Sequence, residues 1–178
     1  MPGVVGCAKM DPVNRRPVPV PPGPGQESVW DYPRPPALVR SDRRVEVWAG
    51  GRLVARSTRA FRVLETSHPP TWYVPREDVV AGALAPSAAA STTCEWKGAA
   101  TYWDVLTDDG VLPAAAWSYE HPRPDFVELA GAVTFYADRL TCTVGGERVR
   151  PQPGGFYGGW ITDDVAGPFK GEPGSWEG

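Results

Sequence analysis

The 178-residue sequence is long enough for one domain with a hydrophobic core. Its 18 basic and 21 acidic residues leave a net charge of -3, which excludes a broad electrostatic attraction to nucleic acid or to an anionic membrane. Three scattered cysteines, Cys7, Cys94 and Cys142, argue against both a disulfide framework and a zinc site. No apolar run is long enough to span a bilayer or to form a signal peptide. We therefore expect a cytoplasmic protein without nucleic-acid or membrane partners, and without a metal or other cofactor.

The start of the chain is predicted to lie outside the folded domain. Residues 1–26 include the run VPVPPGPG, which has too many prolines for a helix or a central strand. We expect an extended or disordered tail, followed by a single β domain over residues 27–178. An inert arm is one interpretation of the tail, and a recognition arm for a proline-binding module is the other.

In the first half of the domain, the pattern predicts strands and one short helix. Residues 43–58 alternate apolar and polar side chains around Gly50-Gly51, as a β-hairpin does. Residues 61–66 continue as a further strand. Asp78 is a candidate helix cap for residues 79–85.

The second half repeats the pattern of strands and tight turns. Two strands are expected across the Asp-Asp-Gly turn at 108–110, and a short helix over 126–130. Hairpins are expected around residues 137–138 and around Gly145-Gly146. Long helical crossovers are absent, so the fold is predicted to be mainly β, with antiparallel sheets and one or two short helices.

The run ETSHPPTWY at residues 65–73 is the first candidate wall of a binding site. Pro69 and Pro70 restrict His68 to an extended conformation and stiffen the loop. A stiff loop would hold Glu65 and His68 in place without an ordering penalty at each binding event. A rigid turn that only covers the core is the alternative.

Two later motifs, EWKG and PFKG, each set a lysine between an aromatic residue and a glycine. The aromatic ring can support the lysine stem while Lys97 or Lys170 contacts an anion. Plain surface charges are the alternative. Cys94 would act as a nucleophile only with a base such as His68 nearby, and is otherwise a small buried side chain.

Aromatic residues accompany both motifs. Trp117, Tyr119 and Trp160 either pack in the core or offer stacking surface. The sequence contains no P-loop, HExxH, GxSxG or paired CxxC motif.

Several of these segments together resemble one family, the bacterial and fungal domain of unknown function 427. The likeness runs from Ser28 to Gly174, through ESVWDYPRPP, ETSHPPTWYVPREDV, CEWKGAATYW, AAWSYEHPRPDFVELAGAVTFY and GGFYGGWITDDVAGPFKGEPG. The positions that match the family's motifs are Glu65, Thr66, His68, Pro69, Pro70, Tyr73, Cys94, Lys97, Gly98, Trp117, Tyr119, Gly159, Trp160, Lys170 and Gly171.

The resemblance implies a tent-like fold, in which two antiparallel sheets meet at an angle and leave a pocket between them. Distant relatives with this fold bind zinc through four cysteines or hold a small ligand in a cage of tryptophans. The chain departs from the zinc pattern. The family is also labelled nucleotidyltransferase-like, but the sequence lacks the pattern of Gly-Ser followed by Asp-x-Asp that such enzymes use, and no catalytic assignment carries over.

Three hypotheses follow. The first is a pocket for a small anionic or cyclic ligand, nucleotide-like compounds included, bound by Trp72, Tyr73, Lys97, Trp117, Tyr119, Trp160 and Lys170. The second is an enzyme that uses His68 and Glu65 as an acid–base pair, such as a nucleotidyl or other phosphoryl transferase. The third is a protein-interaction or dimerisation module, and the chain is expected to be a monomer or a homodimer.

Overall fold

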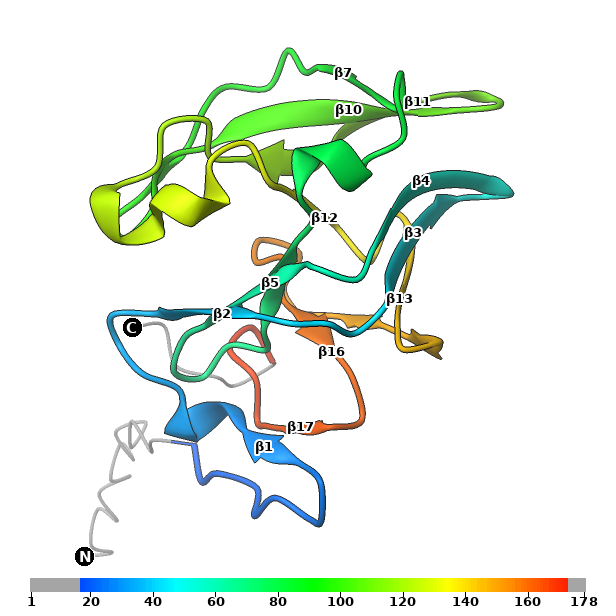
Figure 1. Cartoon of the computed structure of the whole chain (residues 1–178). Helices are drawn as coiled ribbons and strands as arrows, with labels where there is room; N and C mark the ends of the chain where they lie inside the picture. Colours follow the sequence, from blue (N-terminus) through cyan, green and yellow to red (C-terminus); the bar gives the residue numbers. More distant parts are fainter. Residues whose placement is uncertain (1–16, 173–178) are drawn as a thin grey trace, which may run out of the picture.

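The computed structural model describes residues 17–172, which form short strands linked by turns (Figure 1). The strands are β1 (Glu27–Ser28), β2 (Ala37–Arg40), β3 (Val45–Ala49), β4 (Arg52–Ser57), β5 (Phe61–Leu64), β6 (Thr71–Tyr73), β7 (Leu84–Pro86), β8 (Thr93–Cys94), β9 (Gly98–Ala99), β10 (Thr101–Thr107), β11 (Gly110–Ser118), β12 (Val133–Phe135), β13 (Thr141–Val144), β14 (Glu147–Arg148), β15 (Arg150–Pro151), β16 (Trp160–Ile161) and β17 (Val165–Ala166). Three short 3-10 helices join them: η1 (Val29–Asp31), η2 (Arg76–Asp78) and η3 (Pro124–Leu129).

Antiparallel pairing dominates the described part of the chain. One four-stranded sheet has the order β12-β11-β10-β7, a second has the order β14-β13-β3-β4, and a three-stranded sheet has the order β2-β5-β6. In Figure 1 the first of these lies at the top and the second at the right, while β2 and β5 cross the middle. Three two-stranded pairs complete the fold, and only the β1–β17 pair is parallel within residues 17–172. The mainly β, antiparallel prediction is confirmed.

The two Gly-Gly hairpins of the sequence form one sheet. β3 and β4 turn at Gly50-Gly51, β13 and β14 turn at Gly145-Gly146, and β3 pairs with β13. Gly50, Gly145 and Gly146 all have positive φ angles, which other residues adopt only with strain. The predicted hairpins are therefore confirmed, as is the strand predicted to follow the first of them.

The hairpin around Asp108-Asp109 is also confirmed, because β10 and β11 pair on either side of it. The hairpin predicted around residues 137–138 is wrong. Its two flanking strands join different sheets, β12 beside β11 and β13 beside β3. The amides of Arg139 and Leu140 both donate to the Tyr136 carbonyl, and this helical turn redirects the chain. Local alternation predicts a strand but not its partner.

The helix predicted over residues 79–85 is wrong. The Asp78 carboxylate accepts hydrogen bonds from Ser57 and Arg59 instead of capping a helix. The Val80 amide donates to the Val54 carbonyl, and the chain then enters β7. Tertiary partners on β4 and β10 thus satisfy backbone groups that a helix would have paired internally.

The second predicted helix, over residues 126–130, is present as the 3-10 helix η3. It begins at Pro124, and its cap position is Arg123. Proline suits this first position because its missing N–H needs no partner there.

The core lies between the sheets and contains two of the predicted pocket residues. Trp72 and Trp160 are 2% and 0% exposed, and their rings stack at 6.3 Å between centroids. The Trp160 indole donates to the Phe135 carbonyl at 2.9 Å. A second apolar cluster, which includes Tyr73, Trp117, Tyr119, Phe126 and Leu129, lies beside the first.

The described end of the proline-rich segment lies against the C-terminal part of the domain. The Val20 amide donates to the Gly167 carbonyl, and the Gln26 side chain donates to the Asp163 carbonyl. The first 16 residues of the predicted tail lie outside the described residues. Across residues 17–172, no helix has the length and apolar character needed to cross a membrane.

Candidate functional site

A cavity of about 340 Å³ opens beside the second apolar cluster. It lies among the three-stranded sheet, the β10–β11 hairpin, the β8–β9 segment and the C-terminal loops. It is lined by Arg34, Val63, Glu65, His68, Thr71, Tyr73, Thr92, Thr93, Cys94, Glu95, Trp96, Lys97, Ala100, Tyr102, Trp117, Tyr119, Tyr136, Gln152, Phe156, Tyr157, Gly158 and Lys170.

The loop at residues 65–70 forms one wall of the cavity and is held from several sides. Ser67 is buried and has a φ of 72°, an uncommon backbone conformation for a residue other than glycine. Its amide donates to the Val29 carbonyl, and its carbonyl accepts from the Lys170 amide. The surrounding structure therefore fixes the strained turn that presents His68 to the cavity.

His68 is buried and held by a neighbouring amide. Its Nδ1 lies 3.2 Å from the Gln152 side-chain nitrogen, and its ring meets Tyr157 edge-on at 4.8 Å between centroids. Burial, together with the smaller effect of the positive charges of Lys170, Arg34 and Lys97, lowers the pKa of His68 from 6.5 to about 4. The imidazole is therefore neutral near neutral pH.

Lys97 brings a buried ammonium group to the cavity. It lies in the turn between β8 and β9, where its carbonyl accepts from the Arg123 amide and the next residue, Gly98, has a φ of 104°. The side chain is only 8% exposed. Its Nζ lies 5.6 Å from the ring centre of Tyr119 and 5.9 Å from that of Phe126. Among residues 17–172, no carboxylate or other hydrogen-bond acceptor pairs with this Nζ, and the atom is not sealed off, so it opens to the cavity.

Lys170 and Arg34 add positive charge around the cavity. The Lys170 Nζ lies 5.3 Å from the ring centre of Tyr157. Arg34 pairs with Glu65 at 3.5 Å, so one of the two carboxylates at the cavity is already compensated. The other, Glu95, is exposed to solvent. Buried charge in the cavity is therefore positive.

Aromatic side chains form a large part of the cavity lining. The rings of Trp117 and Tyr136 lie 4.5 Å apart, and those of Tyr73 and Tyr119 lie 6.3 Å apart. Burial raises the pKa of the Tyr73, Tyr119 and Tyr136 hydroxyls, in the last case to about 12. These hydroxyls stay protonated and can donate or accept hydrogen bonds without adding charge.

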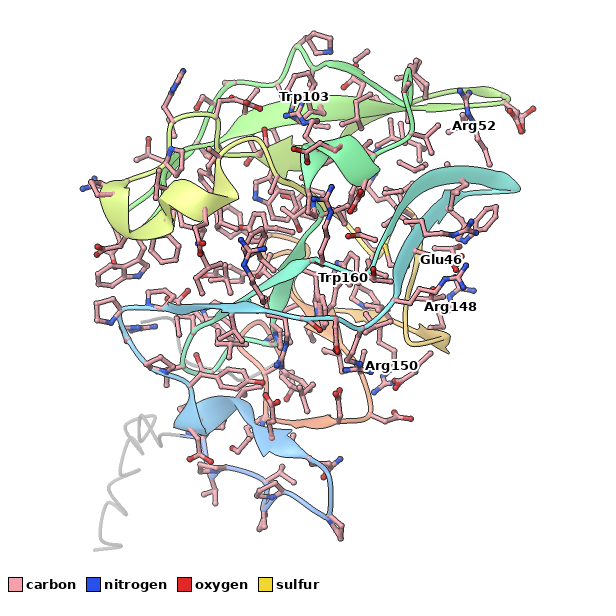
Figure 2. All side chains as sticks on the ribbon, viewed as in Figure 1. Glu46, Arg52, Trp103, Arg148, Arg150 and Trp160 are labelled. Carbon is pink, nitrogen blue, oxygen red and sulfur yellow. The ribbon has the colours of Figure 1, made fainter. Side chains whose placement is uncertain are left out.

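Most of the residues predicted from the sequence line this cavity, and two do not. Glu65, His68, Tyr73, Lys97, Trp117, Tyr119 and Lys170 border it. Trp72 and Trp160 do not, because they stack on each other inside the core. Figure 2 shows Trp160 in the interior of the molecule. Both side chains are too deeply buried to offer the stacking surface proposed for them.

Sequence reasoning missed Gln152, which contacts both His68 and the backbone around it. Its side chain also accepts from the Gly159 amide and donates to the Lys170 carbonyl. The sequence PQPGG gives no periodicity or motif that singles out a glutamine. Arg34 and Tyr136 were missed as well, because their neighbours in space are distant in sequence.

Metal-ligating side chains do not gather in the described residues. Across residues 17–172, no group of three or more His, Cys, Asp or Glu side chains is placed to hold a metal ion. At the cavity itself the carboxylates are Glu65 and Glu95, and the thiol is Cys94.

Fold and cavity together define a class: a small, mainly β domain of antiparallel sheets with a basic, aromatic hollow beside its core. The chain belongs to the family described as Domain of unknown function (DUF427), whose model matches residues 37–146. That match covers the sheet residues that line the cavity, while Gln152, Tyr157 and Lys170 lie beyond it. No curated protein matches the chain.

Proposed function

We propose that this protein binds a small ligand, with an anionic group and a flat ring, in the cavity beside Lys97. The observation that carries the proposal is the Lys97 ammonium, which ends a side chain only 8% exposed, borders the cavity and has no carboxylate partner within residues 17–172. A buried charge is unfavourable unless it is paired and hydrogen-bonded. An anionic ligand would supply the missing partner.

The aromatic residues around Lys97 compensate its charge only in part. Tyr119 and Phe126 stabilise the ammonium through their ring faces, an interaction worth about 0.5–2 kcal/mol. A carboxylate or phosphate would add a charge-assisted hydrogen bond worth roughly 1.5–3 kcal/mol. The site is therefore expected to prefer an anion over a neutral ligand of the same shape.

The exposed parts of Trp117 and Tyr136, which border the cavity, favour a flat ring on the same ligand. Such side chains offer large rigid faces, and stacking of a planar group on an aromatic ring is worth about 1–3 kcal/mol. At about 340 Å³ the cavity lies at the small end of the range of ligand pockets, roughly 300–1,000 Å³. The proposed ligand class is thus a small aromatic or heterocyclic acid, with a mononucleotide as the upper size.

We place this binding function in the cytoplasm. Cys94 and Cys142 are free thiols in the described chain, as expected in a reducing compartment.

The test compares matched acids and amides on the wild type and two variants. Benzoate and benzamide have the same ring and differ in charge, and nicotinate with nicotinamide forms a second pair. Binding is measured by thermal shift and calorimetry, because a ligand that binds only the folded state raises the melting temperature. A mononucleotide series defines the upper size of the ligand.

Lys97→Met removes the charge and keeps the length of the stem. Arg148→Met is the control, because Arg148 is exposed on β14 and does not line the cavity; Figure 2 shows it at the right-hand edge of the molecule. We expect Lys97→Met to weaken acid binding by about tenfold or more and to leave amide binding nearly unchanged. If no acid in either series binds, or if Lys97→Met and Arg148→Met bind acids equally well, the proposal is wrong.

A further inference from the structure

We infer that His68 is a fixed hydrogen-bond donor in the cavity, with its proton on Nε2, and that Gln152 sets this tautomer. The role of His68 toward a ligand rests on the function proposed above. The tautomer itself does not, because it follows from contacts within the protein.

The orientation of the Gln152 amide is determined by two backbone groups. Its Oε1 lies 3.0 Å from the Gly159 amide nitrogen, which can only donate. Its Nε2 lies 2.9 Å from the Lys170 carbonyl, which can only accept. A flipped amide would place donor against donor and acceptor against acceptor, so the orientation is unambiguous.

This orientation decides where the proton of His68 lies. One hydrogen of the Gln152 Nε2 points to the Lys170 carbonyl, and the other is left for the His68 Nδ1 at 3.2 Å. A protonated Nδ1 would set two donors against each other. The Nδ1 must therefore accept, and a neutral imidazole that accepts at Nδ1 carries its proton on Nε2.

The Nε2 of His68 is open to the cavity. His68 borders the cavity, and within residues 17–172 its Nε2 has no hydrogen-bond partner. Among the described residues, the side-chain polar atoms that are fully buried and lack a partner are Arg62 Nε and Thr134 Oγ1. His68 Nε2 is not one of them, so it is accessible. A group without a protein partner that is not sealed off must meet solvent or a ligand.

A donor at this position narrows the ligand class. The ligand must present an acceptor to His68, such as a carboxylate or carbonyl oxygen or an unprotonated ring nitrogen. An amino group there would leave two donors facing each other without an acceptor between them, which disfavours binding. The same tautomer also prevents Nε2 from accepting a proton, so His68 does not serve as a general base toward a ligand in the cavity.

Nitrogen NMR on the full-length protein tests the tautomer without any ligand. The chain has two histidines, and a His121→Asn variant assigns the remaining ring signals to His68. We expect the Nε2 shift of a protonated nitrogen and the Nδ1 shift of an unprotonated one at neutral pH. A protonated Nδ1, alone or in an imidazolium, overturns the inference.

Two variants test whether Gln152 sets the tautomer. In Gln152→Glu the carboxylate has no hydrogen to give, so we expect the His68 proton to move to Nδ1 or the ring to become an imidazolium. In Gln152→Met the side chain keeps its length and loses its polar atoms, and we expect a mixture of the two tautomers. If Gln152 only supported the fold, the ring nitrogen shifts of His68 in both folded variants would match those of the wild type. A wild-type tautomer in either variant would therefore contradict the role of Gln152 in setting the tautomer.

A titration with benzoate tests the donor role. We expect the Nε2–H signal of His68 to shift on binding while the tautomer stays the same. If benzoate binds and this signal does not move, the donor role is wrong. If benzoate and the other acids do not bind but the free protein has the inferred tautomer, the proposed ligand class fails and the tautomer stands.

Discussion

The indole of Trp117 lies directly against the backbone of Gly158. A Cβ atom placed on Gly158 would lie 1.9 Å from Cη2 of the indole, far inside any allowed contact. Trp117 belongs to β11, whereas Gly158 lies in the loop before β16. This contact therefore joins the aromatic wall of the cavity to its C-terminal loop, and only glycine fits at the junction.

We expect Gly158→Ala to destabilise the protein and to deform the cavity. The added methyl group must displace either the loop or the Trp117 ring, and such overpacking typically costs about 1–3 kcal/mol. Urea unfolding measures the loss. Gly51→Ala is the control, because no atom lies within 4 Å of the added methyl group and its φ is not positive. Equal stability of the two variants would contradict the contact.

Trp160 is predicted to matter for stability rather than for binding. Trp160→Ala removes a fully buried ring and its hydrogen bond to the Phe135 carbonyl, so we expect a loss of about 3–5 kcal/mol. Phe156→Ala is the comparison, since Phe156 borders the cavity but is 74% exposed. Its effect on the free energy of unfolding should stay within about 0.5 kcal/mol. Thermal and urea unfolding of both variants check the difference.

The low pKa of His68 predicts a specific acid sensitivity. The unfolded chain binds a proton near pH 6.5, whereas the folded chain does so only near about 4. Between these values the unfolded state binds more protons. The contribution of the neutral His68 to the free energy of unfolding is therefore fully present above pH 6.5 and is lost as the pH drops through this window. The shift corresponds to roughly 3 kcal/mol.

Urea unfolding at several pH values checks this acid sensitivity. We expect His68→Gln to unfold with a weaker pH dependence between 6.5 and about 4 than the wild type. His121→Gln, which changes an exposed histidine outside the cavity, should keep the wild-type slope in the same window. Parallel curves for His68→Gln and the wild type would show that the buried imidazole does not control this transition.

The two described cysteines are predicted to differ in reactivity. Burial raises the pKa of Cys142 to about 12, so almost none of it is thiolate near neutral pH. Cys94 is half-buried and borders the cavity. We expect iodoacetamide to alkylate Cys94 in the native protein and Cys142 only after unfolding, as mass spectrometry of the peptides would show. A bound acid should slow the alkylation of Cys94, and faster labelling of Cys142 would refute the prediction.

Much of the secondary structure was predictable because it depends on local chemistry. Gly50, Gly145 and Gly146 at the two Gly-Gly turns have positive φ angles, and the flanking alternation suits strands. The hairpins of β3–β4 and β13–β14 therefore follow from short segments. The helix prediction for residues 79–85 was wrong because hydrogen bonds to β4 and β10 outweigh a modest local helix signal. A strand's partner is decided by distant segments, which is why the hairpin at residues 137–138 failed.

For the site, the sequence by itself determined which chemical groups are available: a proline-stiffened histidine loop, two lysines beside aromatic residues, and glycines that allow close approach. Tertiary structure alone decided that Lys97 is buried without a carboxylate and that Gln152 fixes the proton of His68. It also placed Trp72 and Trp160 in the core and not at the predicted site. The physical reason is that burial and hydrogen-bond partners arise between segments far apart in the chain, and no local pattern records them.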